Sequence, residues 1–195
     1  MKRRTLLAAC LLAATALLTT SCETAKQVLA NEQMQMLMKN VIVNMMGQRG
    51  TTYSYTGQGT QQQLTLKAGG TAFQDYNETT KAAAFKGTLP VTINNTTANI
   101  TIPTMKVGNG TISALTISNM VLAQDNAGTK ISVGDNSMID GTYTVGGTAY
   151  KASNLYIDAL ITSQQLNVTL MSIYFGDKGE QVVNVTFNGT APEQK

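Results

Sequence analysis

From residue 51 onward the chain is a series of short segments in which apolar and polar residues alternate, and this period of two limits the fold more than any other feature. Successive side chains of a β-strand point to opposite faces, so alternation places one face in a core and the other in water. The pattern predicts half-buried strands around these apolar sets: Leu89, Val91 and Ile93; Ile100 and Ile102; Leu155, Ile157, Ala159 and Ile161; Leu166, Val168 and Leu170; Val183, Val185 and Phe187.

Turn signals rich in Gly, Asn and Asp separate these segments. They recur about every 8 to 15 residues, and no helical stretch between them is long enough for a parallel crossover. We therefore predict a mainly β fold, an antiparallel meander of about eight to ten strands over residues 51–190. Such a meander can close into a barrel or pack as a sandwich. A polar tail, 191–195, follows it.

The alternation is broken at three places. The phase slips between Ala114 and Leu115 and between Leu170 and Met171, which predicts β-bulges or strands buried on both faces. Residues 67–85 fit neither period. We expect a long loop with a short helix there, placed to cap the barrel.

Residues 1–21 have the order of an export signal. Basic residues at 2–4 precede an apolar stretch at 6–18, and small hydroxyl residues follow. The apolar stretch is shorter than the roughly 20 residues that a membrane-spanning helix needs. We therefore expect residues 1–21 to be removed.

The end of this signal resembles the lipobox of bacterial lipoproteins, because Thr20 and Ser21 stand directly before Cys22. The resemblance implies that the Cys22 sulfur is lipidated and that the chain is cut just before it. A lipobox usually has Leu where this chain has Thr19. The stretch LAAC at 7–10 fits better, but cleavage there leaves an apolar core of about five residues, below the roughly 7 to 15 of a working signal. Ordinary cleavage that leaves a free thiol is the alternative.

Cysteine and histidine usage excludes several kinds of active site. Cys10 leaves with the signal, Cys22 is the lipidation site, and the chain has no histidine. The folded domain then has neither a disulfide nor a thiol. Ser-His-Asp and Cys-His nucleophiles and the common zinc sites need imidazole or thiolate groups. We predict a protein that is not an enzyme, with no catalytic residues, metal or cofactor.

Charge argues against a nucleic-acid partner. Loss of the signal removes three of the 14 basic residues, which leaves 11 against 11 acidic residues. After residue 4 the chain has no cluster of Lys or Arg. The electrostatic footprint of nucleic-acid binding is therefore absent.

Residues 24–46 contain neither Gly nor Pro, and their apolar side chains recur along one helical stripe. We predict an amphipathic helix here, within an N-terminal region that spans 22–50. Met34 and Met38 on the stripe are candidate ligand contacts, because thioether side chains are flexible and polarizable. Packing against the rest of the domain is the alternative.

Tyrosines are the aromatic candidates for a binding site. Tyr53, Tyr55, Tyr156 and Tyr174 would line a barrel mouth and stack on an apolar or sugar ligand. Burial in the core or in cross-strand pairs is the alternative.

Two acidic groups have simpler explanations. Asp135, Asn136 and Asp140 offer oxygen ligands but lack the spacing of a calcium loop, and turn chemistry accounts for them. Asp75 and Glu78 could form a glycosidase carboxylate pair, and an exposed polar loop is the alternative.

With the lipobox in place, two further stretches carry a family resemblance: GTYTVGG at 141–147 and NGTISALTISNMVL at 109–122. The chain is similar to the calycin-like (lipocalin-like) β-barrel lipoproteins of gut Bacteroidota. The resemblance implies a barrel and an envelope location, and most members have no assigned activity. A helix such as the one expected at 24–46 is not required by a plain barrel of that family.

Two functions follow as expectations. The first is a lipid-anchored, non-catalytic binding module for a small apolar ligand. The second is a structural or adhesive envelope protein that contacts partner proteins through its sheet and loops. In both, the N-terminal lipid holds the protein on a membrane of the cell envelope, which we expect to be the outer membrane. The sequence does not distinguish the periplasmic side of this membrane from the cell surface.

Overall fold

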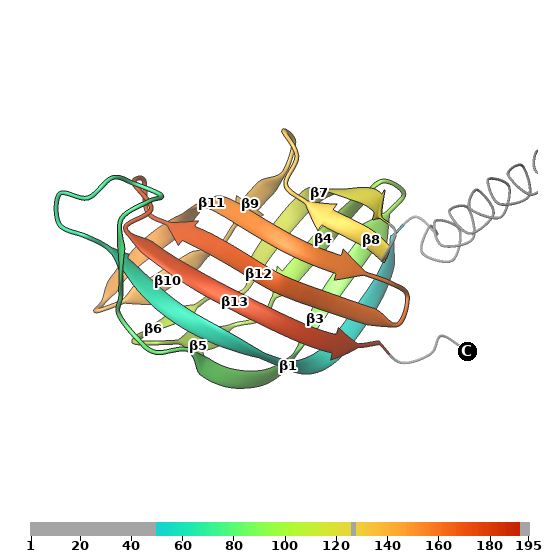
Figure 1. Ribbon diagram of the computed structural model, residues 1–195, viewed down its shortest axis with the longest axis horizontal. Coiled ribbons are helices and arrows are strands. Elements are labelled where there is room, and N and C mark those ends of the chain that lie inside the picture. The colour runs from blue at the N-terminus through green and yellow to red at the C-terminus, as the bar shows by residue number, and fades with distance from the viewer. Residues whose placement is uncertain (1–49, 126–127, 192–195) are drawn as a thin grey trace, which may run out of the picture. The chain divides into compact units, whose positions relative to one another are not determined.

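The computed structural model describes residues 50–125 and 128–191 (Figure 1). Four predictions concern residues outside this part: the signal peptide, lipidation of Cys22, the amphipathic helix with Met34 and Met38, and the tail beyond residue 191.

Eight strands of the described residues form a closed antiparallel barrel. Each long strand pairs with the next along the chain, and the last pairs with the first. The antiparallel meander is therefore confirmed, and its barrel alternative is the one that forms, although the described residues form thirteen strands and not about eight to ten. The barrel strands are β1 (Thr51–Leu66), β3 (Ala83–Asn94), β4 (Thr97–Ile102), β7 (Leu115–Asp125), β8 (Gly128–Ser132), β11 (Thr148–Ile161), β12 (Gln165–Phe175) and β13 (Gln181–Thr190).

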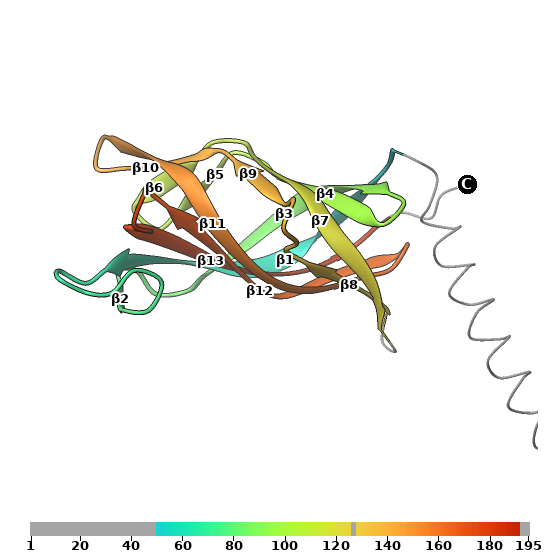
Figure 2. The ribbon, with the colours of Figure 1, turned by 90° about the horizontal axis from the view of Figure 1, so that it is seen from above.

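Five short strands extend this barrel. β10, β6 and β5 continue the sheet from β11, while β2 pairs with β1 and β9 pairs with β7. Figures 1 and 2 place β2 and β10 toward one end of the barrel and β4 and β8 toward the other. Strands of three or four residues carry too little alternation to be read from a sequence. They are β2 (Tyr76–Glu78), β5 (Met105–Val107), β6 (Gly110–Ile112), β9 (Met138–Asp140) and β10 (Thr142–Val145).

Side chains fill the barrel interior. The predicted inward positions of β3 and β13, such as Val91 and Val185, are buried, and the polar positions between them face out. The largest fully buried side chains include Tyr55, Tyr143 and Phe175. The alternating pattern therefore identified the core face of these two strands correctly. On β12 the predicted inward Leu170 is outside the core, and Met171 is buried instead.

The two phase slips have different causes. In β12 the register against β13 shifts between Val168 and Met171, so this slip is a β-bulge, as expected. The slip at Ala114 is not a bulge, because β6 has ended at Ile112 and β7 begins at Leu115. A break between two strands shifts the alternation of inward and outward residues, just as an inserted residue does.

The short helix expected within residues 67–85 is not formed. This part is a loop that leads into β2 and then into β3. Gly69 has a φ of 70°, a left-handed conformation that interrupts a helix. The loop packs outside the barrel: the Phe73 ring meets Tyr174 edge-on at 5.0 Å, and the Tyr76 hydroxyl donates to the Gly179 carbonyl at 3.0 Å.

Candidate ligand-binding cleft

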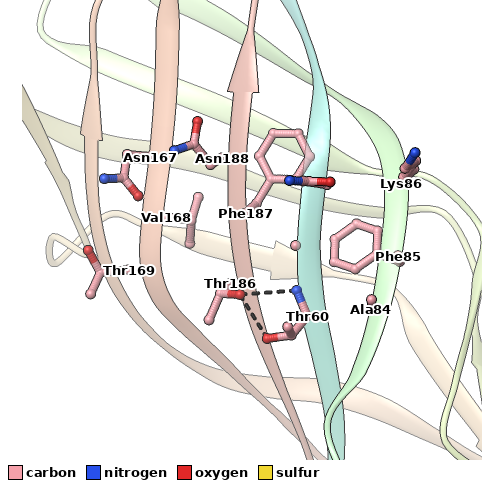
Figure 3. Close-up of a pocket in the computed structure, with 12 residues that line it drawn as sticks. Thr60, Ala84, Phe85, Lys86, Asn167, Val168, Thr169, Thr186, Phe187 and Asn188 are labelled. Carbon is pink, nitrogen blue, oxygen red and sulfur yellow. Dashed lines mark hydrogen bonds between the residues drawn. The ribbon is translucent and has the colours of Figure 1, made fainter.

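An open cleft of about 680 Å³ lies over four neighbouring strands, β12, β13, β1 and β3 (Figure 3). Most of its side chains are amides, hydroxyls or aromatic rings. The lining residues are Gln58, Gly59, Thr60, Ala84, Phe85, Lys86, Asn167, Val168, Thr169, Thr186, Phe187 and Asn188.

Strand register brings the polar lining residues into rows that cross the strands. Asn188 of β13 is paired with Asn167 of β12 on one side and with Gln58 of β1 on the other. Gln58 is also paired with Lys86 of β3. Paired residues have Cβ atoms about 5 Å apart, so the row forms one continuous polar band. A second row contains Thr60, which is paired with Thr186.

Between these rows lies an inward-facing row built around Gly59. Its two partners are Phe187 and Phe85, whose rings stack at 6.1 Å between centroids with 23° between planes. Figure 3 shows the two phenylalanines on either side of β1. Because Gly59 has no side chain, the rings can approach each other across it.

Glycine at positions 57 and 59 is enforced by the approach of β13. A Cβ at Gly59 would lie 1.9 Å from the Thr186 carbonyl oxygen, and one at Gly57 would lie 2.0 Å from that of Asn188. The GQG stretch of 57–59 therefore has a structural role in the wall of the cleft.

The polar side chains of the cleft differ in how they are satisfied. The Thr60 and Thr186 hydroxyls are hydrogen-bonded at 2.8 Å, and the Thr60 N–H donates to the same Thr186 oxygen at 3.0 Å. Within the described residues, the side-chain amides of Gln58, Asn167 and Asn188 make no hydrogen bond to protein, and all three are exposed. These three amides are free to bind a ligand.

The lining suits binding better than chemistry. An amide can donate and accept at once, which matches hydroxyl or amide groups of a ligand. Lys86 is the one ionisable side chain among the lining residues. A general acid paired with a general base is therefore missing from the cleft.

The structure places Tyr53 and Tyr55 inside the barrel on β1. They are 3% and 0% exposed, and their rings stack at 6.2 Å. The Tyr55 hydroxyl donates to the Thr162 carbonyl at 2.6 Å. Burial, and to a smaller extent Tyr53, raises the Tyr55 pKa well above its usual value.

Tyr156 and Tyr174 lie on the opposite, outer face. Tyr156 on β11 is paired with Ser172 of β12, which places it diagonally next to Tyr174. The structure therefore brings Tyr53 and Tyr55 together inside the barrel, whereas Tyr156 and Tyr174 lie outside and the Tyr174 ring contacts Phe73 and Tyr76. The sequence did not predict the cleft amides. Gln58, Asn167 and Asn188 lie on three different strands, and they become neighbours only through the strand pairing.

The acidic groups considered from the sequence stay apart from the cleft. The Asp75 carboxylate accepts a hydrogen bond from the Thr71 N–H at 2.9 Å, which is a contact within its own loop. In residues 50–125 and 128–191, no three His, Cys, Asp or Glu side chains are grouped so that they could hold a metal ion.

Among the described residues, no helix is long and apolar enough to cross a membrane. Comparison with known proteins gives no match to any protein family model, to any curated protein sequence or to any solved structure.

Proposed function

We propose that this chain is a lipid-anchored envelope protein whose calycin-like barrel serves as a non-catalytic binding module. The anchor is the lipid on Cys22, and the ligand occupies the outer cleft over β12, β13, β1 and β3. The observation that carries the proposal is the set of three exposed, uncommitted amides, Gln58, Asn167 and Asn188, in a cleft of about 680 Å³.

The size of the cleft supports this proposal. Small-molecule sites in proteins have volumes of about 300 to 1,000 Å³ and combine apolar surface with a few polar groups. Here the exposed Ala84 side chain, paired with Thr60, provides apolar surface beside the polar rows.

The chemistry of the lining refines the ligand expected from the sequence. A purely apolar ligand would displace water from the amides of Gln58 and Asn188 without replacing the lost hydrogen bonds, which is unfavourable. A small neutral ligand with several hydroxyl groups and an apolar face, such as a sugar, would satisfy them. We therefore propose a neutral, polyhydroxylated ligand.

Titration of the full chain with neutral monosaccharides and disaccharides, followed by calorimetry, tests this. Each amide–hydroxyl hydrogen bond contributes about 1 kcal/mol, so replacing Gln58 and Asn188 together by Ala should weaken binding at least about tenfold. The matched control is Asn136→Ala, since Asn136 is an exposed amide in a turn away from the cleft. Equal affinity of the double variant and the control would contradict the proposal.

The structural or adhesive function is the second candidate, and a separate surface favours it. Val121, Val133 and Met138 are 41%, 44% and 62% exposed around β7, β8 and β9. Exposed apolar groups of this kind are typical of contact surfaces. Under this alternative, Met138→Ser should abolish cross-linking to envelope proteins in cells, whereas the Gln58 and Asn188 double variant should leave it unchanged.

A further inference from the structure

One edge of β3 is unpaired over more than half of the strand. β3 pairs with β1 from Ala83 to Ile93, whereas its pairing with β4 covers only Val91–Asn94. Within the described residues, no other strand pairs with β3. Residues 83–89 therefore have a neighbouring strand on the β1 side alone.

The backbone groups that point to the unpaired edge follow from the alternation of the strand. The N–H of Gly50, which directly precedes β1, donates to the Ile93 carbonyl at 3.1 Å, so the backbone groups of Ile93 point to β1. In an antiparallel pair, the backbone groups of successive residues point to alternate sides, and the pairing of β3 with β1 has no register shift. The N–H and C=O groups of Ala84, Lys86 and Thr88 therefore point to the unpaired edge.

Pro90 marks the place where β4 leaves β3. Beyond the pair of Val91 and Ile100, the next pair in this register would be Pro90 with Thr101. By the same alternation the nitrogen of Pro90 points to β4, but proline has no N–H to donate there. Prolines within sheets are found at such edges. The unpaired edge is therefore encoded in the sequence.

The exposure of the inward side chains changes along β3 in the same way. Val91 and Ile93, which β4 flanks, are 0% and 1% exposed. Farther along the same inward row, Phe85 is partly exposed and Ala83 is exposed. Figure 3 shows Phe85 on β3, the strand beyond β1. A strand added to this edge would cover the apolar side chains that β4 leaves uncovered.

Lys86 indicates which side chain such a strand would carry. It faces outward and is exposed, and within the described residues it forms no ion pair. Its neighbours Ala84 and Thr88 on β3 and Gln58 on β1 are uncharged. Opposite charges on adjacent strands stabilise their pairing. An acidic residue next to Lys86 is therefore favoured.

We propose that residues 83–89 bind an extended segment of a partner protein by strand addition, with an acidic residue of the partner next to Lys86 and an apolar residue next to Phe85. This interaction goes beyond the function of the cleft and needs no sugar. A second copy of the chain is the weaker occupant. Lysine on an edge opposes pairing between identical edges, and a seven-residue edge of about 23 Å offers far less than the roughly 800 Å² per partner of a stable dimer.

The first test titrates the full chain with heptapeptides in which apolar residues and threonine alternate around a central Glu or Lys, measured by fluorescence anisotropy. The wild type should bind the Glu peptides about fivefold more tightly than the Lys peptides, and Lys86→Glu should reverse this preference. Methylation of one alternate set of peptide nitrogens should abolish binding, whereas methylation of the other set should not, because only one set faces β3.

Thr88 provides a matched pair of variants outside the cleft lining. Thr88→Pro and Thr88→Val both lose the 2.9 Å contact between the Thr88 and Thr56 hydroxyls, but only Thr88→Pro loses the N–H that faces the edge. Thr88→Pro should weaken peptide binding at least about fivefold relative to Thr88→Val. Sugar binding in the cleft should be equal in the two variants, and thermal melting shows whether each is folded.

Hydrogen exchange of the wild type tests the edge without any substitution. The amides of Ala84, Lys86 and Thr88 should exchange rapidly in the free chain and become protected when the Glu peptide is bound. Slow exchange of all three in the free chain would show that the edge is already paired and would overturn the inference. Failure to bind any of the peptides, equal binding of both methylated forms, or protection that grows with protein concentration alone would also overturn it. None of these results depends on whether the cleft binds a sugar.

Discussion

Replacing Gly59 by Ala should break the wall of the cleft. The added Cβ would lie 1.9 Å from the Thr186 carbonyl oxygen, whereas ordinary contacts of this kind begin at 3.4 Å. β1 and β13 would have to separate by about 1.5 Å at this point. A ladder hydrogen bond lengthened by that amount is lost.

The cost follows from what the separation disrupts. Two backbone hydrogen bonds at about 1 kcal/mol each, together with about 1 kcal/mol of loosened packing around Phe187, give about 3 kcal/mol. For a chain of this size, 1 kcal/mol lowers Tm by about 2 to 4 °C, so Gly59→Ala should lower Tm by about 6 to 12 °C.

Gly87→Ala is the matched control, because a Cβ there would meet the Phe85 ring at 3.8 Å, an ordinary contact. This variant should stay within about 1 kcal/mol of wild type, since Ala also reduces the entropy of the unfolded chain. Urea and thermal unfolding measure both variants. Equal stability of the two variants would refute the claim that the approach of β13 dictates glycine at position 59.

Three further predictions concern the core and the anchor. Tyr55→Phe removes the 2.6 Å hydrogen bond to the Thr162 carbonyl. This variant should lower the free energy of unfolding, measured by urea titration, by about 1 to 2 kcal/mol. An unchanged free energy of unfolding would contradict a stabilising role of that bond. Burial raises the pKa of Tyr143 to about 12, although a hydrogen bond with the Gly110 backbone partly opposes this. The folded state therefore retains this proton above pH 10, where the unfolded state loses it, so the stability that it contributes is complete below pH 10 and falls as the pH rises toward 12. Tyr143→Phe should flatten this fall in unfolding experiments at alkaline pH, and an identical pH profile would contradict the assignment. Cys22→Ser should release a soluble, folded protein from membranes in cell fractionation, whereas loss of folding would indicate a structural role for this cysteine.

Alternation predicted the core well because each strand samples both faces many times. Ile100 and Val185 were identified as buried from their neighbours alone, and both are in the core. The sequence left barrel and sandwich open, because the closing pair, β13 with β1, joins segments at opposite ends of the domain. Local pattern carries no information on such a pairing.

The alternation of apolar and polar residues did not predict the polar side chains that are buried in the interior. Gln63 is 1% exposed, donates to the Gln181 side chain at 3.0 Å and accepts from the Asn109 N–H at 2.9 Å. These three residues are far apart in the sequence, and each is a typical surface residue on its own. Burial of Gln63 and Gln181 is tolerated because these hydrogen bonds, one of them from the backbone of the exposed Asn109, satisfy their side chains.

The candidate cleft was missed for a related reason. Gln58 and Asn188 belong to different strands, and their common row exists because β1 and β13 meet in one register. A shift of β13 by one residue would turn Asn188 into the barrel and leave Gln58 outside. Tyr53 and Tyr55 were predicted as ligand contacts at a barrel mouth, but both face inward on β1 and are buried in the core.

Side-chain amide signals in nuclear magnetic resonance spectra test the central claim, binding in the outer cleft, most directly. The ¹⁵N-labelled full chain is titrated with the neutral monosaccharide or disaccharide that binds best. The NH₂ signals of Gln58, Asn167 and Asn188 should shift together and saturate with the affinity measured by calorimetry, while the Asn136 signal stays in place. Saturable binding that leaves the three cleft amides unshifted would contradict the account.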